Sequence, residues 1–201
     1  MRTQAAAGYW ASRRHFRYYR EVVRLAREHV PAGGSVIDVG AHETELLERL
    51  DWFERRVALD IHHVPPRPGI EAVVADFDEF EPNGRFDLAL CLQVLEHLDR
   101  PEPFASKLVD AGRTAIISVP HRWAPWVTEE HVQDPVDERK LRRWTARKPI
   151  ETSIVEDLGM ERLIAVYRDD VSTRSRRPRG IWRKRVPSSR KDSSSPVQRN
   201  R

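Results

Sequence analysis

The stretch FDLALCLQVLEHL, residues 86–98, joins a continuous apolar run to a group of polar residues. Leu88–Leu92 carry no charge, which is typical of a strand buried on both faces of a parallel sheet. Gln93, Glu96 and His97 follow where this strand is expected to end. Because open α/β sheets bind ligands at the carboxyl ends of their strands, the stretch predicts a buried strand with a polar site beside it.

Similar apolar runs occur on both sides of this stretch and alternate with helical patterns. Continuous apolar strands separated by helices predict a Rossmann-like α/β fold with a doubly wound, mostly parallel, seven-stranded sheet. A short loop containing Gly159 joins the last two runs and predicts a terminal antiparallel hairpin. The other expected strands are Ser35–Val39, Val57–Leu59, Ala72–Val74, Ala115–Val119, Glu151–Val155 and Glu161–Tyr167, and the expected helices are Glu45–Phe53, Pro103–Val109 and Asp137–Trp144.

Residues 9–30 are expected to form one amphipathic helix before the sheet begins. Its apolar residues fall at helical spacing, and arginines occupy the opposite face. Pro31 follows and ends the pattern. We therefore divide the chain into an N-terminal helix or lid (1–32), a main domain (33–168) and a tail (169–201); the apolar helix positions are Phe16, Tyr19, Val23, Ala26 and Val30.

The basic character of the chain is concentrated in the tail. Residues 169–201 carry a net charge of +8, whereas the rest of the chain carries −4. The tail is rich in Ser, Arg and Pro, a composition that predicts disorder, and nucleic acid is not expected as a partner of the acidic main domain. Cys91 is the single cysteine, and we find no membrane span or secretory signal. These features predict a cytoplasmic protein without disulfides.

Four strand ends carry residues suited to a nucleotide-like ligand. A glycine after the first strand, Gly40, allows close approach of the backbone, and Asp38 lies just before it. An acidic residue about twenty positions later, Asp60, can accept hydrogen bonds from a ribose. Asp76 ends the third strand, where a carboxylate can accept from an adenine amino group while Phe77 covers the base.

Residues 36–98 resemble motifs I to IV of class I S-adenosylmethionine (SAM)-dependent methyltransferases, and the resemblance extends over residues 33–168. It implies that Gly40 lies against the methionine end of SAM and that Gln93 lines the sulfonium side. The full set of cofactor residues expected from it is Asp38, Gly40, Asp60, Ile61, Asp76, Phe77 and Gln93.

One departure from the family concerns the glycine-rich turn. His42 and Thr44 stand where relatives carry the later glycines of a G-x-G-x-G pattern. Their β-carbons narrow the cofactor space and disfavour positive φ. We interpret this as variation within the family, with loss of cofactor binding as the alternative.

The acceptor of the methyl group is expected beside the fourth and fifth strands. His121 directly follows the fifth strand and is the candidate general base, since imidazole accepts a proton near neutral pH. A surface histidine in a loop is the alternative. Trp123, His131 and Asp134 are candidate substrate residues, because a sugar stacks on an aromatic ring while its hydroxyls bond to carboxylates; they could equally belong to a packed insert.

Glu96 and His97 are candidate metal ligands. In ubiquinone-biosynthetic O-methyltransferases a similar Glu-x-x-Glu-His string binds a divalent metal, which would here be Mg²⁺. Gln93 replaces the first glutamate of that string and offers a weaker, uncharged oxygen. The alternative is that Glu96 and His97 only open a helix beside the cofactor.

These features favour an O-methyltransferase acting on a hydroxyl of a small polar acceptor, a sugar or oligosaccharide, with similarity to small bacterial sugar methyltransferases of polysaccharide biosynthesis. An RNA or protein methyltransferase anchored by the basic tail is a second hypothesis, which strong salt dependence would indicate. A cofactor-binding protein without catalysis, suggested by His42 and Thr44, is a third. No membrane partner is expected, and a homo-oligomer is left open.

Overall fold

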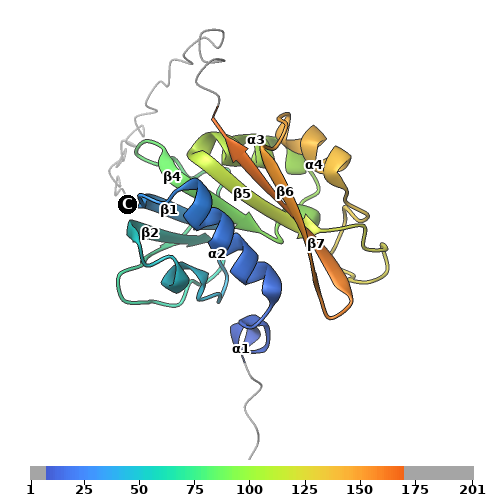
Figure 1. Cartoon of the computed structure of the whole chain (residues 1–201), viewed down its shortest axis with the longest axis horizontal. Coiled ribbons are helices and arrows are strands. Elements are labelled where there is room, and N and C mark those ends of the chain that lie inside the picture. Colours follow the sequence, from blue (N-terminus) through green and yellow to red (C-terminus); the bar gives the residue numbers. More distant parts are fainter. Residues whose placement is uncertain (1–7, 170–201) are drawn as a thin grey trace, which may run out of the picture. The chain divides into compact units, whose positions relative to one another are not determined.

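The computed structural model describes residues 8–169. The segment 170–201, which holds nearly all of the predicted disordered tail, lies outside the described residues, as do residues 1–7. The described part is an α/β fold built on one mixed sheet (Figure 1). The predicted fold class is confirmed.

The sheet has seven strands, and its order reverses at the first one. The strands are β1 (Gly34–Val39), β2 (Phe53–Asp60), β3 (Glu71–Val74), β4 (Phe86–Leu92), β5 (Gly112–Pro120), β6 (Glu151–Asp157) and β7 (Met160–Arg168). Their order is β3-β2-β1-β4-β5-β7-β6, with parallel pairing from β3 to β5 and antiparallel pairing of β7 with both neighbours. Because β1 lies between β2 and β4, the chain leaves it in opposite directions, which opens a crevice at its carboxyl end.

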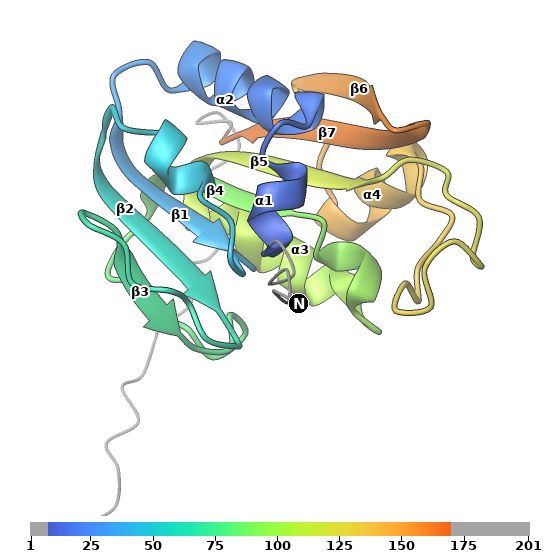
Figure 2. The same cartoon turned by 90° about the horizontal axis from the view of Figure 1, so that it is seen from below.

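Helices cover both faces of the sheet. Helix α2 (Arg17–His29) contacts β5, β6 and β7 on one face, and α3 (Pro101–Ala111) contacts β4, β5 and α4 (Glu138–Thr145) on the other. Figure 2 shows α2 on the side of the sheet opposite to α3 and α4. Adjacent residues of one strand serve different cores: Ile116 packs with α2, and Ile117 packs with α3. This explains why the strands are continuously apolar.

The N-terminal segment forms two helices instead of the single one predicted. Helix α1 (Tyr9–Arg13) ends before Phe16, which has an extended backbone and precedes α2. The carboxylate of Asp157, the last residue of β6, accepts hydrogen bonds from the backbone N–H groups of Arg17 and Tyr18 at 2.8 and 3.0 Å. A side chain from the far end of the chain thus caps α2 and fixes its start, which local periodicity could not reveal.

The helix predicted over Glu45–Phe53 is also wrong. Only a 3₁₀ turn, Leu46–Arg49, occurs between β1 and β2, and Phe53 already belongs to the next strand. The connection must run back along all six residues of β1, about 20 Å. An α-helix over all thirteen residues of the connection would rise about 20 Å and leave no residues for turns, so a more extended path forms.

The other predicted elements are present. α3 and α4 match two expected helices, and the Asp137 carboxylate caps α4 by accepting from the Lys140 N–H at 2.7 Å. Leu158 and Gly159 join β6 to β7 with φ of 56° and 75°, as a tight hairpin turn requires. Among residues 8–169, none of the helices has the length and apolar character needed to cross a bilayer.

Candidate active site

A cavity of about 640 Å³ opens at the carboxyl ends of β1, β2 and β4. This is the crevice created by the reversal of strand order. All seven residues predicted to bind the cofactor line it: Asp38, Gly40, Asp60, Ile61, Asp76, Phe77 and Gln93.

The turn after β1 depends on one glycine. Gly40 has a φ of 78°, and a β-carbon at this position would meet Cγ2 of Val94 at 2.4 Å. His42, which replaces a family glycine, also has a positive φ of 47°. Its backbone N–H donates to Oδ2 of Asp60 at 2.9 Å. The histidine therefore adopts the conformation that glycine would have, and a hydrogen bond to the neighbouring strand end holds it there.

Two neighbouring carboxyl groups in the cavity wall, those of Asp60 and Asp38, differ in their hydrogen bonds and in their pKa. Asp60 accepts backbone N–H groups on both oxygens, from His42 and from His62 at 2.8 Å. Asp38 is 2 % exposed, and burial, with the neighbouring charge of Asp60, raises its pKa to about 7. Asp38 is thus a buried acid beside a cavity, and a cationic ligand group there would favour its ionised form.

The residues expected around the adenine differ in how far they reach the cavity. Phe77 is 3 % exposed and packs its ring on Phe104 at 4.9 Å, so it is mainly a core residue at the cavity wall. Ile61 is 61 % exposed and offers more apolar surface to a base. Asp76 accepts from the Asp78 N–H at 2.8 Å.

Gln93, which is expected on the sulfonium side of the cofactor, has a φ of 57°. Its side chain donates a hydrogen bond to Ser118 Oγ at 3.1 Å, which connects the end of β4 to β5.

The methyl acceptor is expected at the ends of β4 and β5, and we call this side of the cavity the acceptor edge. Residues that are far apart in the sequence lie together there. Glu96, His97 and His131 place one potential ligand atom each within 4.8 Å of one another. His131 contacts the Asp134 carboxylate through Nδ1 at 2.7 Å, and Trp123 stacks on its ring at 5.6 Å. His97 itself lines the cavity. The predicted metal and substrate residues therefore form one cluster beside the cofactor crevice.

His121 lies in a different place from this cluster. Its ring is 5 % exposed and does not appear in the cavity wall. Nδ1 contacts the Glu161 carboxylate at 2.9 Å, while Nε2 is buried without a hydrogen-bond partner among the described residues and lies 3.6 Å from Glu138. The ring has the carboxylate partner of a general base, but His121 is not among the residues that line the cavity, and its role stays a prediction.

The sequence interpretation missed two aromatic residues of the cavity. Tyr18 and Tyr19 line it from the start of α2, on the N-terminal segment that was expected to act as a lid. Neighbouring residues of a helix point in different directions, so the sequence gave no indication that both tyrosines line one cavity. Arg162 of β7 lies over the Tyr18 ring at 5.1 Å and over Trp123 at 5.4 Å, linking this wall to the acceptor edge.

Comparisons with known proteins agree with this geometry. Residues 9–154 match a family described as a methyltransferase domain, and the chain belongs to that family. Together with the sheet order and the cavity, this makes the protein a class I SAM-dependent methyltransferase, and SAM is its cofactor. The predicted family and cofactor are thereby confirmed. A comparison with curated protein sequences gave no match.

Solved structures with the same fold include methyltransferases of different substrates. The N-methyltransferase NodS from Bradyrhizobium japonicum WM9, in complex with S-adenosyl-L-homocysteine, is 16% identical with a TM-score of 0.60, covering 77% of this chain and 89% of that one. The 1,6-didemethyltoxoflavin-N1-methyltransferase from Burkholderia thailandensis is 18% identical with a TM-score of 0.62, covering 76% and 78%. Magnesium protoporphyrin IX methyltransferase from Synechocystis PCC 6803 is 15% identical with a TM-score of 0.56, covering 74% and 80%. At these identities the likeness establishes the fold alone.

Proposed function

We propose that the protein transfers the methyl group of SAM to a hydroxyl of a small polar acceptor, a sugar or an oligosaccharide. The observation that carries this proposal is the polar cluster beside the cofactor cavity, where Trp123 stacks on His131 and His97 faces the crevice. Aromatic faces combined with carboxylates and imidazoles suit the C–H faces and hydroxyls of a sugar.

The size of the cavity favours a small acceptor. Its volume of about 640 Å³ falls within the range of about 300–1,000 Å³ that is usual for small-molecule sites. SAM must occupy much of this space. The remaining volume suits a small acceptor beside His97 and Glu130, which also line the cavity.

The reaction is an in-line displacement. The acceptor oxygen attacks the methyl carbon while the bond between carbon and the sulfonium sulfur breaks, which leaves S-adenosylhomocysteine and releases the hydroxyl proton. Alignment of the two reactants supplies much of the rate. We assign the proton to His121, whose Nε2 can accept it through water while Glu161 holds Nδ1.

The acceptor edge also fits a divalent metal. Glu96 has a buried carboxylate without a hydrogen-bond partner among the described residues, and His97 lies next to it at the cavity wall. Glu96 and His97 would hold the divalent ion. When bound, a divalent ion makes a coordinated hydroxyl more acidic.

Transfer of labelled methyl from SAM into a cell extract tests the acceptor class. We expect label in the saccharide fraction, when this is separated from other small molecules, RNA and protein, and less label after chelator treatment. Label confined to RNA or protein would contradict the proposal and favour a macromolecular substrate. Measurable SAM binding without label in any fraction would favour a protein that does not catalyse.

The assignment of His121 is tested separately. His121→Ala should lower the turnover number by about 100-fold or more, the usual contribution of a general base, while leaving SAM affinity unchanged. His63→Ala is the matched control, because His63 is exposed and does not line the cavity. Unchanged turnover in His121→Ala would remove His121 as the base.

A further inference from the structure

Three side chains from two separate segments converge beside the cavity. Glu96 and His97 lie in the 3₁₀ turn Leu95–His97 after β4, and His131 lies in the loop after β5. One ligand atom from each lies within 4.8 Å of the others. The Val132 N–H donates to the Glu96 carbonyl at 3.0 Å, which holds the two segments in register.

The Glu96 side chain lacks the partners that a buried carboxyl normally has. It is 0 % exposed, and neither carboxylate oxygen accepts a hydrogen bond from any residue of the described chain. A buried polar group without a partner is unfavourable, and a charged one far more so. The Glu96 carboxyl therefore needs a cation or a hydrogen-bond donor, and the side chains of the described residues supply neither.

Both imidazoles already have a partner on Nδ1. His97 Nδ1 lies 3.1 Å from the Glu130 carbonyl, which can only accept, so Nδ1 carries the proton and Nε2 has the free lone pair. His131 Nδ1 lies 2.7 Å from the Asp134 carboxylate, whose side chain is 0 % exposed. Metal-bound histidines usually have this second partner, which sets the tautomer and the ring orientation.

We propose that Glu96, His97 and His131 form a site for a divalent transition metal of the Zn²⁺ type, with Asp134 and the Glu130 carbonyl orienting the two imidazoles. Two imidazoles and one carboxylate favour borderline metals such as Zn²⁺ over Mg²⁺, which prefers oxygen ligands. Three protein ligands leave a position for water or an acceptor oxygen on the side of His97. The catalytic use of the metal rests on the proposed function, but metal binding itself does not.

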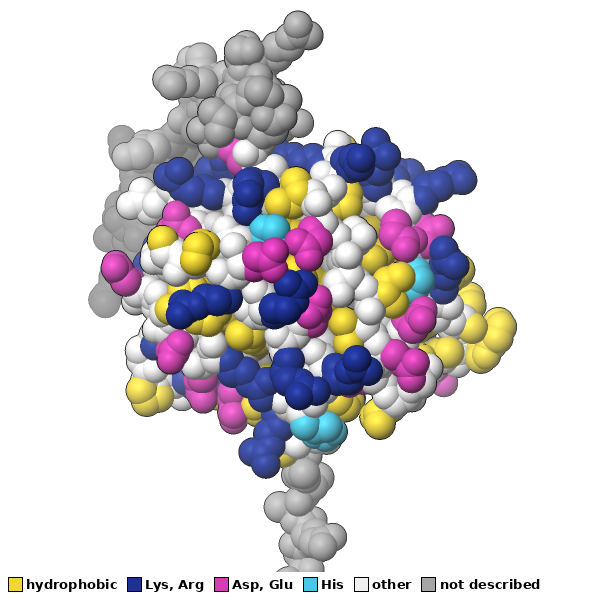
Figure 3. Space-filling model, viewed as in Figure 1, with side chains coloured by type: hydrophobic (Ala, Val, Ile, Leu, Met, Phe, Trp, Pro, Cys, Tyr) yellow, Lys and Arg dark blue, Asp and Glu magenta, His cyan; other side chains and the backbone are white. Residues whose placement is uncertain are grey.

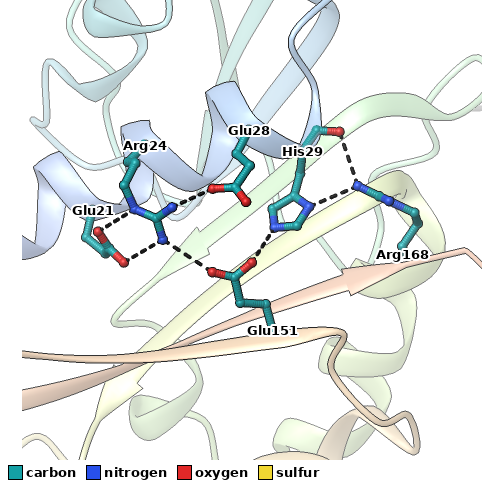
Figure 4. Close-up of polar contacts among 6 residues, drawn as sticks. All are labelled: Glu21, Arg24, Glu28, His29, Glu151 and Arg168. Atoms are coloured by element: carbon teal, nitrogen blue, oxygen red, sulfur yellow. Dashed lines mark hydrogen bonds and ion pairs between the residues drawn. The ribbon is translucent and has the colours of Figure 1, made fainter.

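A second cluster with the same residue types serves as an internal control. Glu28, His29 and Glu151 also place potential ligand atoms within 4.8 Å of one another. Figure 4 shows, however, that Arg168 donates to His29 Nδ1 at 2.9 Å and that Arg24 contacts both carboxylates. Because arginine only donates, His29 must direct its Nε2 proton to Glu151, which leaves no lone pair for a metal.

Calorimetric titration of untagged, chelator-treated full-length protein with Zn²⁺, Co²⁺ and Mg²⁺ tests the proposal without an acceptor. We expect one Zn²⁺ per chain, visible absorption bands with Co²⁺, and much weaker binding of Mg²⁺. His131→Ala should weaken Zn²⁺ binding by about 100-fold or more, and Asp134→Asn by about 10- to 100-fold. His29→Ala should leave it unchanged, and thermal unfolding of the metal-free variants reports whether they fold.

Each contrary outcome has a distinct meaning. Absence of Zn²⁺ binding, equal affinity for Mg²⁺, or equal loss in His29→Ala and His131→Ala would overturn the metal site. If Asp134→Asn folds and binds Zn²⁺ as the native protein does, the orienting role is wrong. Because these measurements need no methyl acceptor, failure of the sugar hypothesis leaves their result intact.

Discussion

The pKa values of acidic side chains shift in opposite directions on the outer face of the sheet and at the edge of the cavity. On the outer face, where α2 lies near β6, His29 and then Arg24 lower the pKa of Glu151 through hydrogen bonds. At the cavity edge, burial raises the pKa of Glu96 to about 8 and that of Asp38 to about 7. Figure 3 shows the outer face, with basic and acidic side chains intermingled over it.

The difference lies in where the compensating cation comes from. On the outer face the chain supplies its own arginines, so those acids are structural. At the cavity edge, the carboxylate of Glu96 has no hydrogen-bond partner among the described residues, and the neighbouring charge that acts on Asp38 is the negative one of Asp60. SAM carries an ammonium and a sulfonium group, and a metal ion would add another positive charge. These two acids are therefore expected to be matched by ligands instead of side chains.

The largest expected effect comes from replacing Asp60, whose carboxylate is already held in place by two backbone hydrogen bonds. Asp60→Ala should weaken SAM binding by about 100-fold or more, because the hydrogen bonds expected to the ribose hydroxyls and the two observed to the backbone are lost together. Isothermal titration with SAM measures this. The control is Glu151→Gln on the outer face, which should bind SAM normally; similar weakening in both variants would show that the loss is only structural.

A smaller effect is expected from pH through Asp38. Its pKa of about 7 in the free protein means that a cationic ligand group must displace a proton below that pH. SAM affinity should fall by about tenfold per pH unit as pH drops below 7, and Asp38→Asn should remove this dependence. An equal pH dependence in the variant would assign the effect to another group.

The raised pKa of Asp38 also makes the free energy of unfolding depend on pH, but in the opposite direction from SAM affinity. Because the folded pKa of Asp38 lies above its ordinary value of 3.8, its stabilising contribution is complete below that value and is lost as pH rises through about 7. Thermal unfolding of the protein without SAM should therefore show a decline over this window. Saturating SAM should reduce the decline, and Asp38→Asn should flatten it.

The smallest effect is expected on the outer face. Glu151→Gln should lower the free energy of unfolding by about 0.5–1 kcal/mol, since the group is partly exposed and screened. The lowered pKa of Glu151 means that this contribution is present above its ordinary value of 4.5 and lost as pH falls through the lower folded value. Urea unfolding at low and high salt measures it; a loss of several kcal/mol would place this cluster among the essential elements of the core.

Some parts of the site were predictable because they depend on short stretches of sequence. An apolar run followed by Asp60 or by Gln93 shows where a parallel strand ends, and parallel strands end at the same edge. The sequence interpretation therefore placed the predicted cofactor residues at one edge of the sheet, where all seven line the cavity, and their binding of SAM stays a prediction. It failed for the break before α2, because the cap comes from Asp157, and for the connection after β1, where strand length excluded a full helix.

The sequence by itself determined the alternation of strands and helices, the position of the crevice at the carboxyl ends of the strands and the residue types along its edge. Only the tertiary structure decided which of two Glu-His pairs has an unpaired carboxylate. Glu28-His29 and Glu96-His97 are the same dipeptide, yet arginines lie beside the first, whereas His131 lies beside the second, whose carboxylate is fully buried. Burial and the supply of cations depend on neighbours brought from distant parts of the chain, and those properties decide the chemistry.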